Sequence, residues 1–417
     1  MNVVILDTTE FGFAPNRVLK ALQKKGVNAK MIVRTKFTDD ESVITINTSW
    51  ITKKINYLRF AWERFIIFLN NKFNRSDLFR VSIANTGNNL INHPIIKNAD
   101  IIHLHWINHG FLSLKSIHSI IKTGKPVVWT MHDMWPCTGI CHHARECINF
   151  TNECGNCFYL TSNKKNDLSY RVFQKKKELI YANNITLVGC SKWLANKAKI
   201  SNLSKNQNIV SIPNPINISL FDITDKMHAR KMFNLPSNKQ LILFGAININ
   251  DKRKGIDYLV EGIKNLQSDY HKSADNIELV VMGNVNYNLD TMFNIPVHNM
   301  GYINEKEKVV GLYNASDIFV TPSLDENLPN VIMEAMACGI PCVGFNTGGI
   351  PEMIDHKQNG YVAYYEDAAD LAKGINWILN EADYNVLSEN ARKKVVESYS
   401  EDIVTDKYMQ LYKNLLN

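Results

Sequence analysis

The hydrophobic pattern of the chain predicts a first set of buried strands that alternate with helices. Short runs rich in branched apolar residues end in polar or glycine-containing loops, and amphipathic stretches follow them. The predicted strands of this set are 3–7, 29–35, 99–106, 125–133 and 185–191. The stretch SIPNPIN at 211–217 then has the turn-rich, proline-containing composition of a linker.

The same pattern begins again after this linker. A second set of strands is predicted at 240–246, 277–283, 297–302, 317–323 and 341–346, and the stretch 383–416 is helical and amphipathic. Such alternation is typical of parallel sheets with helices on both faces. We therefore expect an α/β protein with two Rossmann-like, doubly wound domains that face each other across a cleft.

The domain limits follow from the position of the linker. Residues 1–215 are expected to form an N-terminal domain with a cysteine-rich insertion at 137–157, and residues 216–395 a C-terminal domain. A last helix at 396–417 is expected to pack back on the N-terminal domain. No repeat of 20–50 residues relates the two halves, so their similarity is architectural.

Composition supports a globular protein. The chain has 417 residues, of which 45% are hydrophobic and 21% charged, and that length suits about two or three domains. No apolar run approaches the ~18–20 residues of a membrane span. The first residues, MNVVILDTTEFGF, lack the basic start and cleavage site of a signal peptide, so we expect a cytoplasmic protein.

Positive charge is concentrated in one amphipathic segment. The formal net charge is +7, and 51–80 contains seven Lys or Arg against Glu63 and Asp77. Apolar and aromatic residues recur there at spacings of three and four, from Ile55 to Phe73. A basic, aromatic-rich helix suits the cytoplasmic face of an anionic inner membrane. The alternative is a helix packed on its own domain with solvated lysines. Nucleic acid is disfavoured, because no nucleic-acid module is recognisable.

The stretch DIFVTPSLDENLPNVIMEAMACG at 317–339 predicts a strand, a loop and a helix. Pro329 suits the first helical turn, and Gly339 suits the end of the helix. The free N–H groups of the loop and the helix start are suited to a phosphate or a sugar. Glu334 within the helix is suited to a ribose diol, and Glu326 lies nearer to a group attached to the phosphate.

These residues resemble the donor-site segment of the retaining GT-B enzymes of glycosyltransferase family 4. The resemblance includes the two glutamates, the following NTGGIPEMIDHKQNGYV, and DKRKG, VVMG, MGYI and LYNASDIFV upstream. In the first half, ADIIHLHW, VVWTMHDMWPCTGICHH and CSKWLA resemble a bacterial branch that acts in capsule, exopolysaccharide or O-antigen assembly. Nearly the whole chain is covered, except about 36–90.

The resemblance implies a role for each matching residue. Glu334 would hold the ribose of a nucleotide-sugar donor, and Glu326 would contact the transferred sugar. Lys254 would neutralise the diphosphate, and His132 would lie near the donor sugar. The loop that would receive sugar hydroxyls or phosphate consists of Asn327, Leu328, Pro329 and Asn330. For Lys254 the alternative is a solvated lysine in a turn. For His132 it is a hydrogen-bonded histidine of the core, and for Glu326 it is a charge at the start of a helix.

Two positions depart from the family pattern. The family usually has an arginine just after the strand that ends in Gly245, but this chain has Ala246, so Arg253 is the candidate second cation. Gly12 would let the first loop approach the donor, although the usual double glycine is reduced to FGFAP. The resemblance implies that the leaving diphosphate is stabilised by these cations and a helix dipole, without a catalytic metal.

Five of the eight cysteines lie between 137 and 157. The pair Cys154 and Cys157 has the spacing of a metal-binding knuckle, and Cys141 and Cys147 complete four thiolates. We expect a structural zinc site, with free thiols or disulfides as alternatives. A reducing cytosol disfavours disulfides.

The function that follows is retaining transfer of a sugar from a UDP- or GDP-sugar. The expected acceptor is a saccharide or a polyprenyl-diphosphate-linked sugar in bacterial surface polysaccharide synthesis. The alternatives are a nucleotide-sugar epimerase or phosphorylase of the same fold, and a zinc-binding scaffold protein without catalysis. The donor motifs are intact in this chain, which disfavours the scaffold protein.

Overall fold

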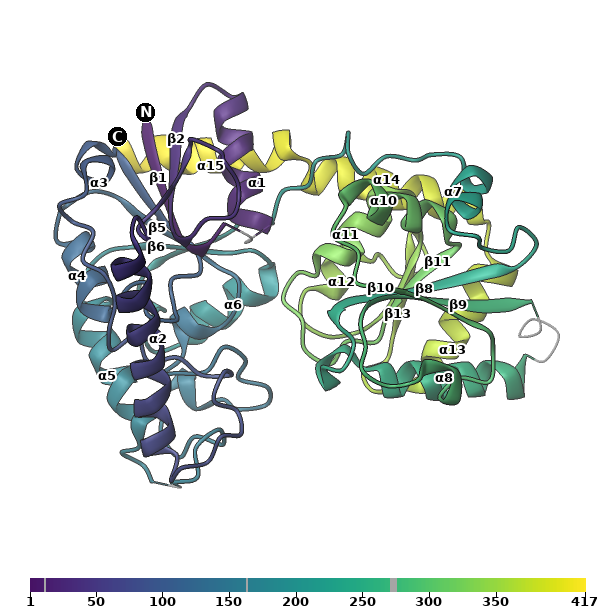
Figure 1. Ribbon diagram of the computed structural model, residues 1–417, viewed down its shortest axis with the longest axis horizontal. Helices are drawn as coiled ribbons and strands as arrows, with labels where there is room; N and C mark the ends of the chain where they lie inside the picture. Colours follow the sequence, from purple (N-terminus) through teal and green to yellow (C-terminus); the bar gives the residue numbers. More distant parts are fainter. Residues whose placement is uncertain (11–12, 163, 271–275) are drawn as a thin grey trace. The chain divides into compact units, whose positions relative to one another are not determined.

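The chain forms two compact α/β units in the computed structural model, which describes residues 1–10, 13–162, 164–270 and 276–417 (Figure 1). The first unit consists of Met1–Pro213 and Val404–Asn417, and the second of Asn214–Ile403. The chain therefore changes unit two residues before the predicted domain limit, and it returns at 404 rather than at 396. Within the described residues, no helix combines the length and the apolar character needed to cross a membrane.

A seven-stranded parallel sheet forms the centre of the first unit. Its strand order is β3-β2-β1-β4-β5-β6-β7. The strands are β1 (Asn2–Thr9), β2 (Asn28–Thr35), β3 (Val43–Thr45), β4 (Ile101–Leu104), β5 (Val127–Met131), β6 (Thr186–Gly189) and β7 (Asn208–Ser211). All neighbouring pairs are parallel. The edge strands β3 and β7 were not predicted, because neither is a long buried apolar run.

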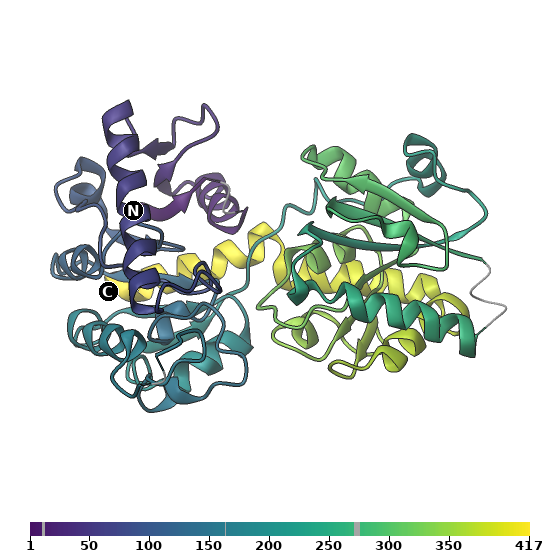
Figure 2. The ribbon, with the colours of Figure 1, turned by 60° about the horizontal axis from the view of Figure 1, so that its bottom comes forward.

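Helices cover both faces of this sheet. They are α1 (Phe13–Lys24), α2 (Trp50–Asn70), α3 (Pro94–Asn98), α4 (Leu114–Ile121), α5 (Leu168–Leu179), α6 (Lys192–Ile200) and the C-terminal α15 (Glu401–Leu416), with short 3₁₀ turns η1 (Trp135–Cys137) and η2 (Asn149–Thr151). Val3 and Ile5 of β1 pack with α1 and α15, whereas Val4 and Leu6 face the opposite cluster. This alternation is the two-residue period of a strand. Both ribbon views show α15 beside β1 and β2 (Figures 1 and 2).

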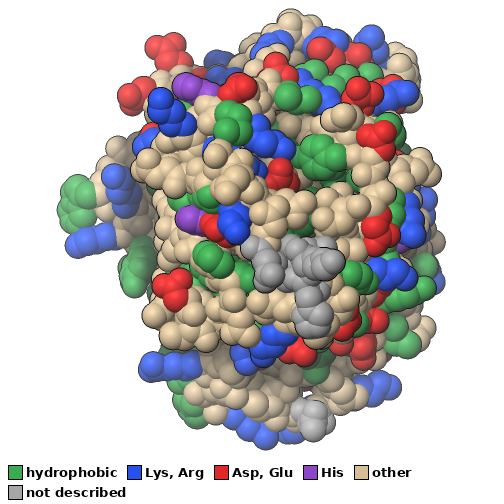
Figure 3. Space-filling model, turned by 90° about the vertical axis from the view of Figure 1, so that its right-hand side faces the viewer, with side chains coloured by type: hydrophobic (Ala, Val, Ile, Leu, Met, Phe, Trp, Pro, Cys, Tyr) green, Lys and Arg blue, Asp and Glu red, His purple; other side chains and the backbone are tan. Residues whose placement is uncertain are grey.

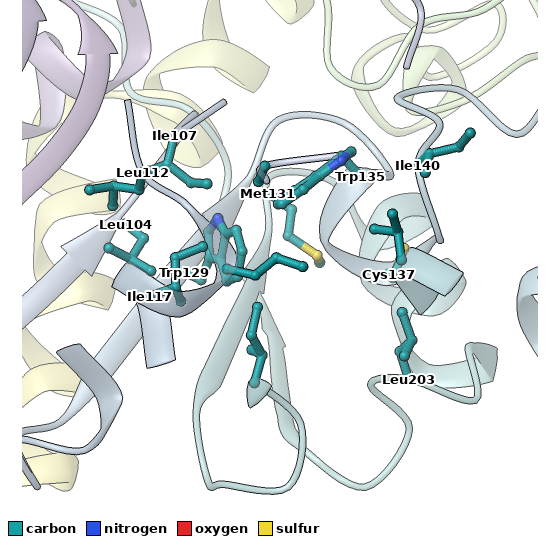
Figure 4. Packing of buried hydrophobic residues seen from close by; sticks show 14 of the residues in the cluster. Leu104, Ile107, Leu112, Ile117, Trp129, Met131, Trp135, Cys137, Ile140 and Leu203 are labelled. Atoms are coloured by element: carbon teal, nitrogen blue, oxygen red, sulfur yellow. The ribbon is translucent and has the colours of Figure 1, made fainter. Parts of the chain in front are cut away.

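The larger core cluster surrounds two tryptophans. Trp129 on β5 and Trp135 on η1 are almost fully buried, with ring centroids 5.9 Å apart. Figure 4 shows them among Leu104, Ile107, Met131 and Cys137. The loop after β5 is therefore packed into the core rather than lying over it, which fixes the position of the residues that end this strand.

The second unit has a six-stranded parallel sheet in the order β10-β9-β8-β11-β12-β13. The strands are β8 (Gln240–Asn248), β9 (Ile277–Asn284), β10 (Val297–Gly301), β11 (Ile318–Thr321), β12 (Cys342–Phe345) and β13 (Gly360–Ala363). The helices and turns are α7 (Lys226–Met232), η3 (Lys252–Lys254), α8 (Ile256–Asp269), η4 (Leu289–Thr291), α10 (Lys306–Ala315), α11 (Asn330–Ala337), α12 (Ile350–Met353), α13 (Ala368–Asn376), η5 (Trp377–Glu381) and α14 (Tyr384–Tyr399). The predicted helix at 383–416 is thus two helices that meet at Ser400, where a bridge to Ile216 interrupts it.

The expected fold class is confirmed in its two parallel-sheet, Rossmann-like units. In each sheet the strand order reverses beside the first strand of the unit, β1 or β8, and ligands of such sheets bind at the carboxyl ends near this point. The predicted cleft between the units stays a prediction.

Candidate active site

The turn after β8 is held against the end of β11. Asp251 caps the 3₁₀ turn by accepting a hydrogen bond from the Arg253 N–H at 3.0 Å. Gly255 ends the turn with φ of 71°, and a Cβ atom there would lie 1.8 Å from the carbonyl oxygen of Pro322. The Leu324 N–H also donates to the Arg253 carbonyl at 2.8 Å. Only glycine fits this approach of two loops, and it brings the predicted cations beside the predicted glutamate loop.

Lys254 and Glu326 form an ion pair at this point. Their side chains are 29% and 15% exposed, so the pair is partly shielded but open to solvent on one side. The backbone of Gly348 packs closely against the loop that carries Glu326. A Cβ atom at Gly348 would lie 1.6 Å from the Glu326 carbonyl oxygen, so only glycine allows this contact. The structure therefore brings together two residues that lie 72 positions apart and were predicted for one site.

The N-terminus of α11 lies next along the chain. Asn327, Leu328 and Pro329 are buried, and Pro329 is the residue before the first turn rather than within it. The Asn330 side-chain oxygen is buried and has no hydrogen-bond partner among the described residues. An unsatisfied buried acceptor is costly, so this oxygen is available to a ligand hydroxyl.

Glu334 lies within α11, as predicted. The hydroxyl of Tyr313, a buried residue of α10, donates to its Oε2 at 3.3 Å. Burial and the neighbouring Glu334 raise the pKa of Tyr313 well above its ordinary value, so the phenol stays a donor. Tyr313 was missed by the sequence analysis, although it lies in the LYNASDIFV stretch.

Arg253 is engaged by its own turn. Its guanidinium donates to Asp251 through Nε at 3.2 Å and through a terminal nitrogen at 2.6 Å. A diphosphate would have to compete with this carboxylate for Arg253. The role of a second cation therefore stays a prediction, and Lys254 is the better-placed charge.

In the first unit, His132 directly follows β5 and lies beside a second histidine. Its Nε2 is 2.9 Å from Nδ1 of His105, which follows β4. A small cavity at the ends of these strands is lined by both histidines, Trp106, Asn108 and Asp133. Burial lowers the pKa of His132 to about 4 and that of His105 well below its ordinary value, so both rings are neutral near pH 7. A neutral ring orients or polarises a ligand and carries no positive charge.

Asp133, the residue after His132, forms polar contacts of its own. Its Oδ2 lies 2.7 Å from His142 Nδ1 and accepts a bond from the Trp106 indole N–H at 3.0 Å. Burial raises the pKa of Asp133, but attraction to His142 and hydrogen bonds outweigh burial and hold it well below its usual range. His142, which lies within the cysteine segment, is thus engaged by this carboxylate.

Asp7 in β1 is a buried carboxyl that the sequence analysis missed. Its oxygens accept bonds from the backbone N–H groups of Thr9 at 2.9 Å and Trp106 at 3.1 Å. Burial raises its pKa to about 7 in spite of these bonds. Such a shift is typical of functional carboxyls. Its signal in the sequence was an acidic residue inside an otherwise apolar first strand. The predicted donor residue Gly12 lies outside the described residues.

The cysteine segment is packed into the core of the first unit. Cys141, Cys154 and Cys157 are buried, and burial raises the pKa of each thiol to about 12. Neighbouring thiols, including that of Cys147, raise these pKa values further, so the four sulfurs share one neighbourhood. Among the residues that the structure describes, no group of three or more His, Cys, Asp or Glu is arranged to hold a metal. The four-thiolate zinc site therefore stays a prediction.

Comparison with known proteins identifies the second unit. Residues 225–394 match the family described as Glycosyl transferases group 1. This match lies wholly within the second unit and covers less than half of the chain. The matched region includes Lys254, Glu326 and Glu334, whereas His132 and the cysteine segment lie outside it.

Two relatives and one solved structure illustrate the similarity. The chain is 24% identical to the capsular polysaccharide biosynthesis glycosyltransferase CapM of Staphylococcus aureus, over 55% of this chain and 62% of the relative. It is 26% identical to the UDP-Gal:alpha-D-GlcNAc-diphosphoundecaprenol alpha-1,3-galactosyltransferase of Escherichia coli, over 32% and 34%. A glycosyltransferase of Rickettsia africae has the same fold, with a TM-score of 0.65 and 16% identity over 100% of this chain and 99% of that one.

This chain spans only part of the length of the curated relatives that it matches. The first three are covered over 53%, 30% and 56%. The solved structures extend the similarity of fold to both units and are GT-B glycosyltransferases.

Proposed function

We propose that this protein is a retaining glycosyltransferase that uses a nucleotide-sugar donor, a UDP- or GDP-sugar. The acceptor is a saccharide or a polyprenyl-diphosphate-linked sugar in the synthesis of a bacterial surface polysaccharide. The Lys254–Glu326 pair carries the proposal, because it lies within the family region at the carboxyl end of the second sheet. The relatives named for capsule synthesis and for a diphosphoundecaprenol acceptor support the acceptor class.

Each charged group of the second unit has a part in the proposed reaction. In the free protein the Lys254 ammonium is neutralised by Glu326. A bound donor places its diphosphate against the ammonium, which stabilises the charge that develops as the nucleotide leaves. Glu326 is then released toward the transferred sugar, and Glu334 accepts bonds from the ribose hydroxyls.

His132 acts on the sugar side of the reaction. Its ring is neutral and bonded to His105, so it is held in one orientation. We assign it to positioning the donor sugar rather than to nucleophilic attack. Retention would follow from same-face transfer, in which a diphosphate oxygen assists deprotonation of the acceptor hydroxyl.

The proposed location is peripheral, on the cytoplasmic face of the inner membrane, where lipid-linked acceptors would be reached. The segment 51–80 would make this contact. Zinc is proposed only as a structural ion of the cysteine segment, and no step of the transfer uses it.

Donor binding and turnover test the proposal. A panel of UDP- and GDP-sugars should contain a donor that raises the melting temperature of the wild-type protein, because a ligand of the folded state stabilises it. Lys254→Ala, Glu326→Ala and His132→Ala should each lower turnover of that donor by about 100-fold or more.

Lys252→Ala is the matched control, since it removes a neighbouring cation of the same turn and should retain activity. Full activity in both Glu326→Ala and His132→Ala would contradict the site. Product analysis separates transfer from epimerisation, because an epimerase would convert the donor without an acceptor.

A further inference from the structure

Helix α2 has its polar side inward and its apolar side outward. Its buried residues are Asn56, Glu63, Arg64 and Ile67. The exposed large apolar side chains of the helix include Ile51, Ile55, Leu58, Trp62, Phe65 and Leu69. These six recur at spacings of four and three, so they form one stripe along the outer face. The usual surface helix of a soluble domain has the opposite arrangement.

Polar bonds fix this helix in place. Glu63 Oε1 accepts the backbone N–H groups of Ile83 at 2.7 Å and Ala84 at 2.8 Å. Arg64 donates to the carbonyl of Val81 at 2.9 Å and lies 3.2 Å from Glu63 Oε2. Ser49 begins the helix with a capping box that includes Thr52. The outer stripe is therefore not needed to hold α2 on its own unit.

The exposed apolar surface is concentrated at α2 and the loop after it. Ten of the 25 exposed large hydrophobic side chains of the described residues lie between 50 and 79. Trp50, Leu58 and Phe73 are each about two-thirds exposed, at 65%, 64% and 67%. Figures 1 and 2 show α2 on the outside of its unit. The face in Figure 3, by contrast, mixes acidic and basic side chains with scattered apolar ones.

Unpaired positive charge borders this surface. Lys53, Lys54, Lys72 and Arg75 have no acidic partner within the described part of the chain. The two acidic residues of the segment are already used, since Glu63 pairs with Arg64 and Asp77 with Arg80 at 2.9 Å. The Lys54 ammonium lies 4.8 Å from the centre of the Trp50 ring. Aromatic rings beside cations suit the headgroup region of an anionic bilayer.

We propose that α2 and the loop to Arg80 dock on an anionic lipid bilayer, with the α2 stripe at the boundary between headgroups and acyl chains. The helix lies in the plane of the surface, where its apolar side chains leave water and its cations meet lipid phosphates. This inference deepens the peripheral location within the proposed function, by naming the surface and its lipid. Its readout does not depend on catalysis.

A second copy of the chain is the rival occupant. Spacings of four and three also suit the seam of a coiled coil. Two copies, however, would bring the same cations together with no acidic residues to oppose them. Charge complementarity therefore favours anionic lipid over self-association.

Vesicle binding of the full chain tests the proposal. The wild type should co-sediment with phosphatidylcholine vesicles that contain about 30% phosphatidylglycerol, and at least about tenfold less with pure phosphatidylcholine. High salt should weaken binding. The double variant Trp62→Glu with Phe65→Glu should lower binding at least about tenfold, because two carboxylates replace inserted rings.

The matched control is Ile148→Glu with Tyr364→Glu, which adds the same charge at positions that are 71% and 72% exposed. It should bind vesicles like the wild type. Lys53→Gln with Lys54→Gln should lose the preference for anionic vesicles, and melting curves verify that every variant is folded. A wild type that does not bind vesicles, equal binding of the Trp62/Phe65 variant, or a dimer that this variant dissociates would overturn the proposal. Donor turnover, measured separately, distinguishes these outcomes from failure of the proposed transfer.

Discussion

His103 shows how a single buried side chain makes the stability of this protein depend on pH. Its two ring nitrogens are bonded to Thr130 Oγ1 at 2.8 Å and to the Tyr412 hydroxyl at 2.7 Å. Burial lowers its pKa to about 3. The folded ring therefore stays neutral at pH values where an unfolded histidine binds a proton.

The free energy of unfolding should fall below the ordinary histidine pKa. Above pH 6.5 both states are neutral at His103, and this residue adds no pH dependence. As the pH falls from 6.5 toward 3, the unfolded state gains a proton that the folded state does not bind. Between pH 7 and pH 5 the loss should be about 2 kcal/mol for this histidine.

Denaturant unfolding of His103→Gln measures this contribution. The variant should show a smaller loss between pH 7 and pH 5 than the wild type, by about 2 kcal/mol. His228→Gln, at an exposed position of α7, should behave like the wild type. An equal pH dependence in His103→Gln and the wild type would show that the neutral ring is not the cause.

Sequence motifs identified some of the site residues and missed others. Glu326, Glu334 and Lys254 were predicted because each lies in a motif of local residues. Asp7, His105 and Tyr313 were missed, because each acts through a partner that is distant in sequence. Trp106, for example, donates its backbone N–H to Asp7 across 99 positions.

At the scale of the element, the cysteine segment packs against a buried lysine of its own unit. Lys176 of α5 is fully buried and donates to the carbonyls of Trp135 at 2.6 Å and Thr138 at 3.0 Å. Cys154 Sγ accepts the Gly139 N–H at 3.2 Å. These bonds hold the segment against α5 and against its own backbone, which the sequence analysis did not foresee.

Metal analysis decides whether the four thiols also bind zinc. We predict one zinc per chain by mass spectrometry of protein purified under reducing conditions, because Cys154 and Cys157 have the spacing of a metal-binding knuckle and Zn²⁺ displaces thiol protons when it binds. Cys154→Ser with Cys157→Ser should remove it. Cys338→Ser, a buried cysteine of the second unit, should retain it. A wild type without stoichiometric zinc would contradict the prediction.

Helix α2 illustrates the limit of periodicity at this scale. Spacings of three and four predicted a helix, and the structure has one from Trp50 to Asn70. Periodicity does not say which side is buried. The bonds that Glu63 accepts from the backbone of Ile83 and Ala84 decided this, because a buried carboxylate must be satisfied.

At the scale of the whole molecule, the first unit is completed by the end of the chain. Val404, Tyr408, Leu411 and Tyr412 of α15 are buried in the cluster that contains Val3 and Ile5. The Tyr408 hydroxyl also bonds Thr130 at 2.9 Å, across 278 positions. Each of these side chains contributes about 2 kcal/mol by burial, a large share of the ~5–15 kcal/mol that stabilises a domain.

A chain that ends at Ile403 should therefore lose the unfolding transition of the first unit or show it at a much lower temperature. The second unit should keep its own transition, because Asn214–Ile403 contains its complete sheet and core. Differential scanning calorimetry measures both. A chain that ends at Lys413 is the control, since it retains the four buried residues. Equal transitions in the two shortened chains would contradict a role for α15 in the first core.

The sequence by itself determined the two parallel-sheet units, the linker between them, the family of the second unit and the loop that carries Glu326. These properties depend on local patterns, such as strand and helix periods, glycines at tight turns and short motifs. The tertiary structure decided that Lys254 pairs with Glu326, that His132 rests on His105, and that the apolar side of α2 faces outward. It also decided that α15 completes the first core. Each of these depends on contacts between distant segments, because burial and pairing are set by packing rather than by the order of residues.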